Sequence, residues 1–159
     1  MKILSLLAQL CAILAGILMT GITLLTCVSL IGRNTTGWTI AGDFELTGVA
    51  TGAAIALFMP LCQLKKGHII VDFFTAKASE STNAFLDRMG ALLVALVFAL
   101  MAWRTVLGGF NAYDSFSGTM MLGFPEWIVY AAMVPPFALC SLIALTQVFG
   151  AGATEGENA

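Results

Sequence analysis

Charged residues in this chain are confined to short segments that separate four long charge-free runs. These runs extend over residues 3–32, 46–64, 89–103 and 127–154. A helix needs roughly 20 apolar residues to cross the hydrocarbon core of a bilayer. In that core every backbone amide needs a hydrogen-bond partner within the protein, so an unbroken apolar run must be helical. The pattern therefore predicts an all-α integral membrane protein with four transmembrane helices.

The expected spans cover residues 4–31, 43–64, 85–107 and 126–149. They form a single four-helix membrane domain over residues 1–150, followed by an acidic tail, residues 151–159, that we expect to be disordered. Strands of a membrane β-barrel would alternate apolar and polar residues over about ten positions, and these runs do not. The first run is twice as long as the apolar region of a secretion signal, so we expect it to remain as a span.

The spans have recognisable beginnings. Asp43 and Glu45 lie in the first turn of the second span, where the helix dipole favours negative charge. Pro125 precedes the fourth span, as proline is tolerated in the first turn of a helix. Trp127 is expected at the level of the lipid headgroups.

The third span is expected to end near Leu107, because Gly108 and Gly109 follow it and loosen the helix. Arg104 would then lie in the final turns of this helix. A long side chain at that position can extend to the lipid headgroups.

The link between the second and third spans is the longest polar stretch. Between Gly67 and Lys77, apolar residues alternate with His68 and Asp72. This pattern predicts a short amphipathic helix that lies in the membrane interface.

The basic residues predict the orientation. Five of them, Lys2, Lys65, Lys66, Lys77 and Arg88, lie on the side of the termini, and two, Arg33 and Arg104, lie on the other side. Cytoplasmic segments carry the excess of Lys and Arg. We therefore expect both termini in the cytoplasm.

Candidate residues for chemistry are few. A transporter that moves ions by itself usually buries ionisable groups near the middle of the membrane, and the expected spans place none there. Glu45 is the deepest carboxylate, about one turn into the second span. We interpret it as an acid stabilised by the helix dipole; a polar contact to a partner helix and, more remotely, a proton relay are the alternatives.

Cofactor and enzyme chemistry have little support. His68 is the one histidine, so two histidines cannot hold a haem within one chain. The four cysteines, Cys11, Cys27, Cys62 and Cys140, have no metal-binding or redox spacing. We expect no catalytic, metal-binding or substrate-binding residue, no cofactor and no enzyme activity.

Small residues recur at four-residue spacing on two spans. Gly48 and Gly52 form such a pair on the second span, beside Thr47 and Thr51, and Ala12, Gly16 and Thr20 repeat the spacing on the first. Small residues let helix backbones approach closely. Two interpretations stay open: the first two spans pack against each other, or this face contacts a second protein.

Three segments carry a more specific pattern. Gly42–Leu46 begins the second span; Lys65–Phe74 follows it and holds a Gly-His-x-x-Val-Asp motif; Leu122–Trp127 leads into the fourth span. Together they resemble the small membrane subunit (DctQ-type) of tripartite ATP-independent periplasmic (TRAP) transporters. The candidate partner or assembly contacts are therefore Asp43, Glu45, Gly48, Gly52, Gly67, His68, Val71, Asp72, Gly123, Pro125 and Trp127.

The resemblance implies a function that the residues alone do not. It implies a non-catalytic scaffold in the bacterial inner membrane, within a transporter that imports organic acids on a sodium gradient. The partners would be a large elevator-type membrane subunit, which the chain braces, and a periplasmic substrate-binding protein, which it helps to dock, together with membrane lipid and no nucleic acid. The alternative is a self-sufficient four-helix proton-coupled exporter, which would need a carboxylate buried in mid-span.

Overall fold

Four long helices make up almost all of the computed structural model, which describes residues 2–65 and 80–148. They are α1 (Lys2–Thr35), α2 (Asp43–Leu64), α3 (Glu80–Asp114) and α4 (Trp127–Val148). Each is long and apolar enough to cross a membrane. The prediction of an all-α chain with four such helices is confirmed. The expected interfacial helix and the acidic tail lie outside the described residues.

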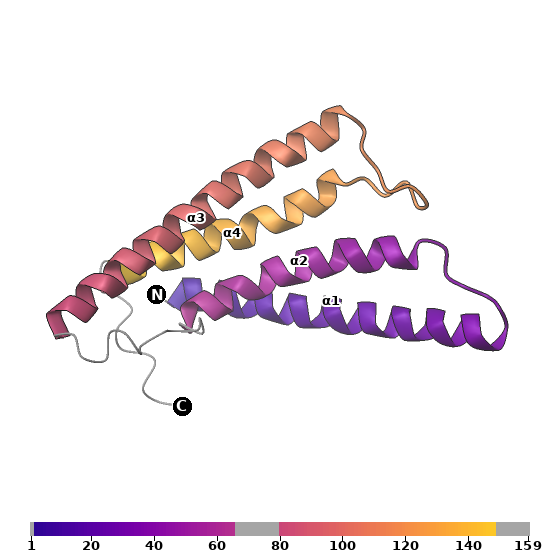
Figure 1. The fold of residues 1–159 in the computed structure, drawn as a ribbon, viewed down its shortest axis with the longest axis horizontal. Coiled ribbons are helices and arrows are strands. Elements are labelled where there is room, and N and C mark those ends of the chain that lie inside the picture. The colour runs from indigo at the N-terminus through magenta and orange to yellow at the C-terminus, as the bar shows by residue number, and fades with distance from the viewer. Residues whose placement is uncertain (1, 66–79, 149–159) are drawn as a thin grey trace.

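The helices form two hairpins, α1–α2 and α3–α4, which pack through α2 and α4 (Figure 1). Across the molecule the order is α1, α2, α4, α3, and within the described chain α3 contacts no helix other than α4. The hairpins lie close together where α1 begins and α4 ends, and they diverge toward the links of residues 36–42 and 115–126 (Figure 1). We call the end with these two links the loop end.

A small apolar core also joins α1 to α4. Ala8 of α1 packs with Leu139 and Ile143 of α4 in the buried core. On α1 the fully buried alanines are Ala8 and Ala15. The buried face of α1 is therefore offset from the stripe of Ala12, Gly16 and Thr20 that the sequence suggested.

Helix α3 continues beyond its expected end. It passes through Gly108 and Gly109 and stops at Asp114 rather than near Leu107. A Cβ atom added at either glycine would lie 3.1 Å from the side chain of Tyr130 on α4. The two glycines thus serve a close approach of α3 and α4 and do not end the helix, so Arg104 lies well inside α3 and not in its final turns.

Two polar contacts join helices inside the apolar region. The Gln63 side-chain amide donates to the Gln147 side-chain oxygen at 2.8 Å, and the Gln147 amide donates to the backbone carbonyl of Gln63 at 2.8 Å. The buried hydroxyl of Ser141 donates to the carbonyl of Ala95 at 3.0 Å. The first contact joins α2 to α4 and the second joins α4 to α3, so both supply partners to polar groups that lipid cannot satisfy.

Candidate functional site

The start of α2 is bound to the end of α1 by side chains. Gly42 precedes the helix in a left-handed conformation, with φ of 77°. One carboxylate oxygen of Asp43 accepts a hydrogen bond from the backbone N–H of Phe44 at 2.7 Å, and the other accepts one from the buried hydroxyl of Ser29 on α1. Asp43 therefore fixes the register between α1 and α2.

Glu45 reaches the other hairpin. Its Oε1 accepts a hydrogen bond from the backbone N–H of Met121 at 2.8 Å, and its Oε2 accepts one from the N–H of Leu122 at 3.2 Å. Both amides belong to the link between α3 and α4. Hydrogen bonds to an ionised carboxylate are stronger than those between neutral groups. The Glu45 side chain thus links the two hairpins at the loop end.

The α3–α4 link is folded tightly enough to present those amides. Thr119 and Phe124 face each other: the Thr119 N–H donates to the Phe124 carbonyl at 3.0 Å, and the Phe124 N–H donates to the Thr119 hydroxyl at 3.1 Å. Gly118 and Pro125 form an antiparallel bridge beside them. Gly123 has φ of 62° within this turn, a conformation that glycine adopts without steric cost.

Gly42 and Leu122 make the second contact between the hairpins at the loop end. A Cβ atom built on Gly42 would lie 2.4 Å from the Leu122 Cγ atom, so only glycine fits against this leucine. Gly42, Asp43, Glu45, Met121 and Leu122 together form what we call the loop-end junction. The structure therefore brings together two of the three sequence segments that carry the family pattern, Gly42–Leu46 and Leu122–Trp127.

Large apolar side chains project from the loop end. Met120 is 100% exposed, Phe116 is 93% exposed and Phe44 is 87% exposed, the three highest values among the large hydrophobic residues described. Met121, at 70%, lies beside them in sequence. We call Phe44, Phe116, Met120 and Met121 the apolar tip. Exposed apolar groups of this kind are typical of surfaces that bind another protein or a membrane.

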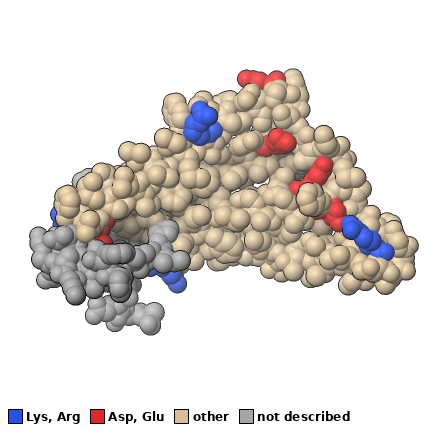
Figure 2. Space-filling model, in the orientation of Figure 1, with Lys and Arg blue, Asp and Glu red and all other residues tan. Residues whose placement is uncertain are grey.

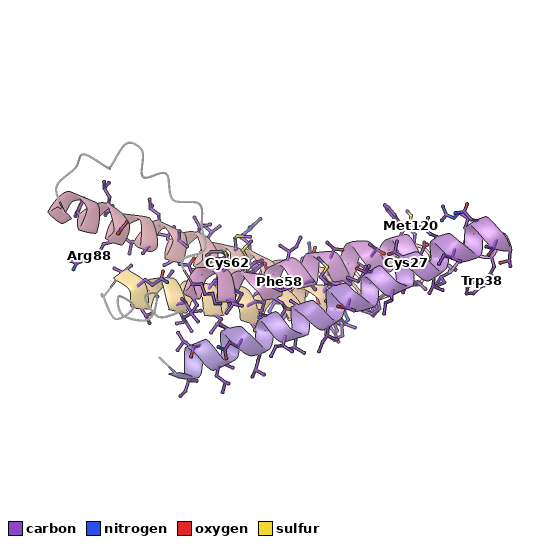
Figure 3. All side chains as sticks on the ribbon, turned by 90° about the horizontal axis from the view of Figure 1, so that it is seen from below. Cys27, Trp38, Phe58, Cys62, Arg88 and Met120 are labelled. Carbon is purple, nitrogen blue, oxygen red and sulfur yellow. The ribbon has the colours of Figure 1, made fainter. Side chains whose placement is uncertain are left out.

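The surroundings of the apolar tip are acidic. Asp43, Glu45, Asp114 and Glu126 all lie in or next to the ends of helices at the loop end. Figure 2 shows Asp and Glu side chains gathered there next to a basic side chain, whereas most of the rest of this face is uncharged. Met120 and Trp38 lie at this end and Arg88 at the opposite one (Figure 3).

The pair Gly48 and Gly52 makes no close contact with another helix in the described part of the chain. A Cβ atom added at either glycine would meet no atom of the described residues within 4 Å. Of the two interpretations, packing of the first two spans through this pair is therefore not supported, and contact with a second protein stays a prediction. Thr47, one residue away, does face α1, with its hydroxyl 3.5 Å from that of Thr26.

The remaining candidates divide in two. Trp127 begins α4 and packs edge-on against Tyr113, with ring centroids 6.0 Å apart. Gly67, His68, Val71 and Asp72 lie outside the described residues. Sequence reasoning missed Ser29, Thr119 and the pair of Gln63 and Gln147, because it searched for charge; uncharged polar residues inside apolar runs were the signal that could have found them.

Two further features concern possible binding sites. An apolar groove of about 430 Å³ lies between the loop-end halves of α3 and α4, and its aromatic lining consists of Phe110, Tyr113, Trp127 and Tyr130. In residues 2–65 and 80–148, no three His, Cys, Asp or Glu side chains come together as a metal site would require. The organised polar groups of the described chain are therefore those that join its helices.

Comparison with known proteins agrees with this arrangement. The family model of tripartite ATP-independent periplasmic transporters, DctQ component, matches residues 22–152. No curated protein and no solved structure gives a significant match. The matched region includes the whole loop-end junction and all of α2, α3 and α4. The chain therefore belongs to the DctQ family of multi-pass membrane components of TRAP transporters.

Proposed function

We propose that this chain is the non-catalytic scaffold subunit of a sodium-coupled TRAP transporter that imports organic acids across the bacterial inner membrane. It braces a large elevator-type membrane subunit and helps to dock a periplasmic substrate-binding protein. Family membership supports a role as a transporter component.

The main support for the proposal is the set of hydrogen-bond partners of the two carboxylates of α2, Asp43 and Glu45. An ionisable group that couples ion or proton movement to transport usually lies in the membrane interior and faces a water-filled cavity or another ionisable group. Asp43 instead binds Ser29, and Glu45 binds two backbone amides of the α3–α4 link. Both carboxylates thus have a structural role, because they join one element of the chain to another. This role argues against the alternative of a proton-coupled exporter that relies on Glu45.

The two hairpins are joined at both ends, as a brace requires. Gln63 and Gln147 join α2 to α4 far from the loop end. Glu45 joins α2 to the α3–α4 link at the loop end. Two separated attachment points restrict rotation of one hairpin relative to the other, so the chain can serve as a stationary element beside a moving one.

The loop end supports the docking role. If the termini are cytoplasmic, as the basic residues predict, the loop end faces the periplasm. There the apolar tip stands among carboxylates, of which Asp114 and Glu126 are not engaged by the junction. An exposed apolar centre within a polar rim is the usual composition of a protein-binding surface.

Reconstitution tests the scaffold role. Proteoliposomes are prepared with this chain alone, with the large subunit alone and with both, each supplied with the loaded binding protein and a sodium gradient. We expect substrate uptake with both subunits and none with this chain alone. Uptake or proton-coupled efflux by this chain alone would contradict the proposal.

Substitution in the apolar tip tests the docking role. Met120→Ser together with Phe116→Ser should raise the concentration of binding protein needed for half-maximal uptake, because the exposed apolar contact is lost. Copurification with the large subunit should be unchanged. Trp38→Ser, at an exposed residue of the other link, is the matched control. An unaltered requirement for binding protein would argue against docking at the tip.

A further inference from the structure

Arg104 points away from every helix that contacts α3 in the described chain. α3 meets α4 through Ala95, whose carbonyl accepts from Ser141, and through Tyr113, which packs on Trp127. Arg104 is nine residues from each of these two contacts. Nine residues are two and a half turns of an α-helix. Arg104 therefore lies on the outer edge of α3, opposite α4.

Arg104 is also remote from the loop end of its helix, which stops at Asp114. Tyr113 and Trp127 pack together at the loop end, and rings of these types are enriched where a span meets the headgroups. The nine residues between Tyr113 and Arg104 correspond to about 13 Å along the helix. The Cα–Cβ bond of a helical residue tilts toward the helix N-terminus, which for Arg104 is the direction away from the nearer headgroups.

The guanidinium has no partner within the chain as described. Arg104 is exposed, and it makes no hydrogen bond or ion pair with the described residues. An unpaired charge that faces lipid at this depth is costly, and charged groups in spans almost always pair with another group or face water.

We propose that a helix of the large membrane subunit packs along the outer edge of α3 and places a carboxylate against Arg104. The proposal rests on the proposed scaffold function and adds the surface and the chemistry of the contact. From residue 93 to residue 107, the residues that share this edge, Arg104 included, are spaced by four, three, four and three, as in a helix–helix seam, and one more lies seven residues before them. Apart from Arg104, they are exposed apolar side chains: Leu86, Leu93, Val97, Leu100 and Leu107.

Two other occupants of this edge fit less well. A lipid phosphate stays in the headgroup layer, and Arg104 lies about 13 Å along α3 from the aromatic pair Tyr113 and Trp127. A second copy of this chain, related by a two-fold axis along the membrane normal, would present the same surface at the same depth. That arrangement would place Arg104 against Arg104, so like charges would face each other. A carboxylate of a different protein removes both difficulties.

Copurification tests the charge. The chain, tagged and expressed with the large subunit, is purified in detergent as wild type, Arg104→Gln and Arg104→Lys. Arg88→Gln, at an exposed arginine near the start of the same helix, is the matched control. We expect Arg104→Gln to lower the recovered large subunit at least tenfold, Arg104→Lys to retain most of it and Arg88→Gln to have no effect. Full recovery of the large subunit with Arg104→Gln would overturn the proposal. If that variant recovers the large subunit but loses bound phospholipid, Arg104 binds lipid and the proposal is overturned as well.

Photocrosslinking tests the surface independently. Benzoylphenylalanine is placed at Leu100 on the α3 edge, or at Ile17, a 66% exposed residue of α1 at the opposite edge of the molecule. We expect an adduct with the large subunit from Leu100. An adduct from Ile17 alone, in a complex of normal yield, would overturn this inference and leave the scaffold function standing. Failure of the wild-type chains to copurify would overturn both.

Discussion

The carboxylate of Glu45 accepts hydrogen bonds from two backbone amides of a distant link. Loss of the carboxylate should therefore change the exchange rates of those two amides first. We predict that Glu45→Ala speeds hydrogen exchange at Met121 and Leu122, because both amides lose an ionised acceptor. Glu45→Gln should have a smaller effect, since the glutamine oxygen can still accept from one of them. Amide exchange read by mass spectrometry on peptides of the α3–α4 link measures the change.

A second carboxylate at the same end provides the control for Glu45. Asp114 ends α3 and is exposed, and its side chain accepts no hydrogen bond from the described residues. Asp114→Asn should leave exchange in the link unchanged. Equal acceleration by Asp114→Asn and Glu45→Ala would mean that net charge, and not the specific contact, protects the amides.

Gly42 combines two constraints that a paired substitution can separate. Gly37 and Gly42 both have positive φ, 70° and 77°, but a Cβ atom at Gly37 meets nothing within 4 Å, whereas one at Gly42 meets Leu122. A left-handed backbone costs an alanine roughly 1–2 kcal/mol. We predict that Gly37→Ala loses about this much stability in detergent unfolding and that Gly42→Ala loses clearly more.

The excess cost of Gly42→Ala should come from Leu122. In the background Leu122→Ala, where the obstructing side-chain atoms are absent, Gly42→Ala should cost no more than Gly37→Ala. If the excess persists in that background, the steric origin is wrong.

The candidate residues at the loop end show how far sequence reasoning reaches at this scale. Asp43, Glu45 and Gly123 were candidates because charge and glycine stand out in an apolar sequence, and all three lie at the loop end. Their partners were not, since Glu45 binds backbone amides, and every residue other than proline carries an amide. Only the folded α3–α4 link, with its left-handed Gly123, selects Met121 and Leu122.

Among the helices, the contact of α2 with α4 depends on a reciprocal glutamine pair. Gln147→Leu removes a donor and an acceptor that Gln63 uses. Interhelical hydrogen bonds in membrane proteins contribute about 0.6 kcal/mol on average and up to about 1.7 kcal/mol. We predict a loss near the upper value, because two bonds are broken together, with unfolding in mixed detergent as the measurement.

A double-mutant cycle tests the pairing of Gln63 and Gln147. The double variant Gln63→Leu and Gln147→Leu should be destabilised less than the sum of the two single variants, because leucine then meets leucine. Ser141→Ala, which breaks the bond from α4 to α3 instead, should be additive with Gln147→Leu. Additive effects of the two glutamine substitutions would show that the pair does not couple.

The number of helices follows from the sequence, but their neighbours do not. Charge-free runs of about 20 residues suffice to predict four spans. In lipid, however, a helix is apolar on all sides, so hydrophobicity does not mark the face that meets another helix. That is why the stripe of Ala12, Gly16 and Thr20 was expected at the interface while Ala8 and Ala15 occupy it, and why the order α1, α2, α4, α3 could not be predicted.

The molecule as a whole is a row of four helices whose two links meet at one end. Hydropathy could not predict that the two links lie together. Their contact depends on Glu45 and Gly42, which touch a link about 76 residues further along the chain. Both links must therefore lie on the same side of the membrane.

Impermeant cysteine labelling tests the sidedness of the row. In a variant without the native cysteines, Thr36→Cys and Met120→Cys should both be labelled in cells with a permeable outer membrane, because the two links share the loop end. Lys65→Cys, at the exposed residue that follows α2, should be labelled only after the inner membrane is opened. Labelling of Lys65→Cys in closed cells, with Thr36→Cys and Met120→Cys protected, would show that the orientation is inverted. The apolar tip would then face the cytoplasm, where it could not contact a periplasmic binding protein.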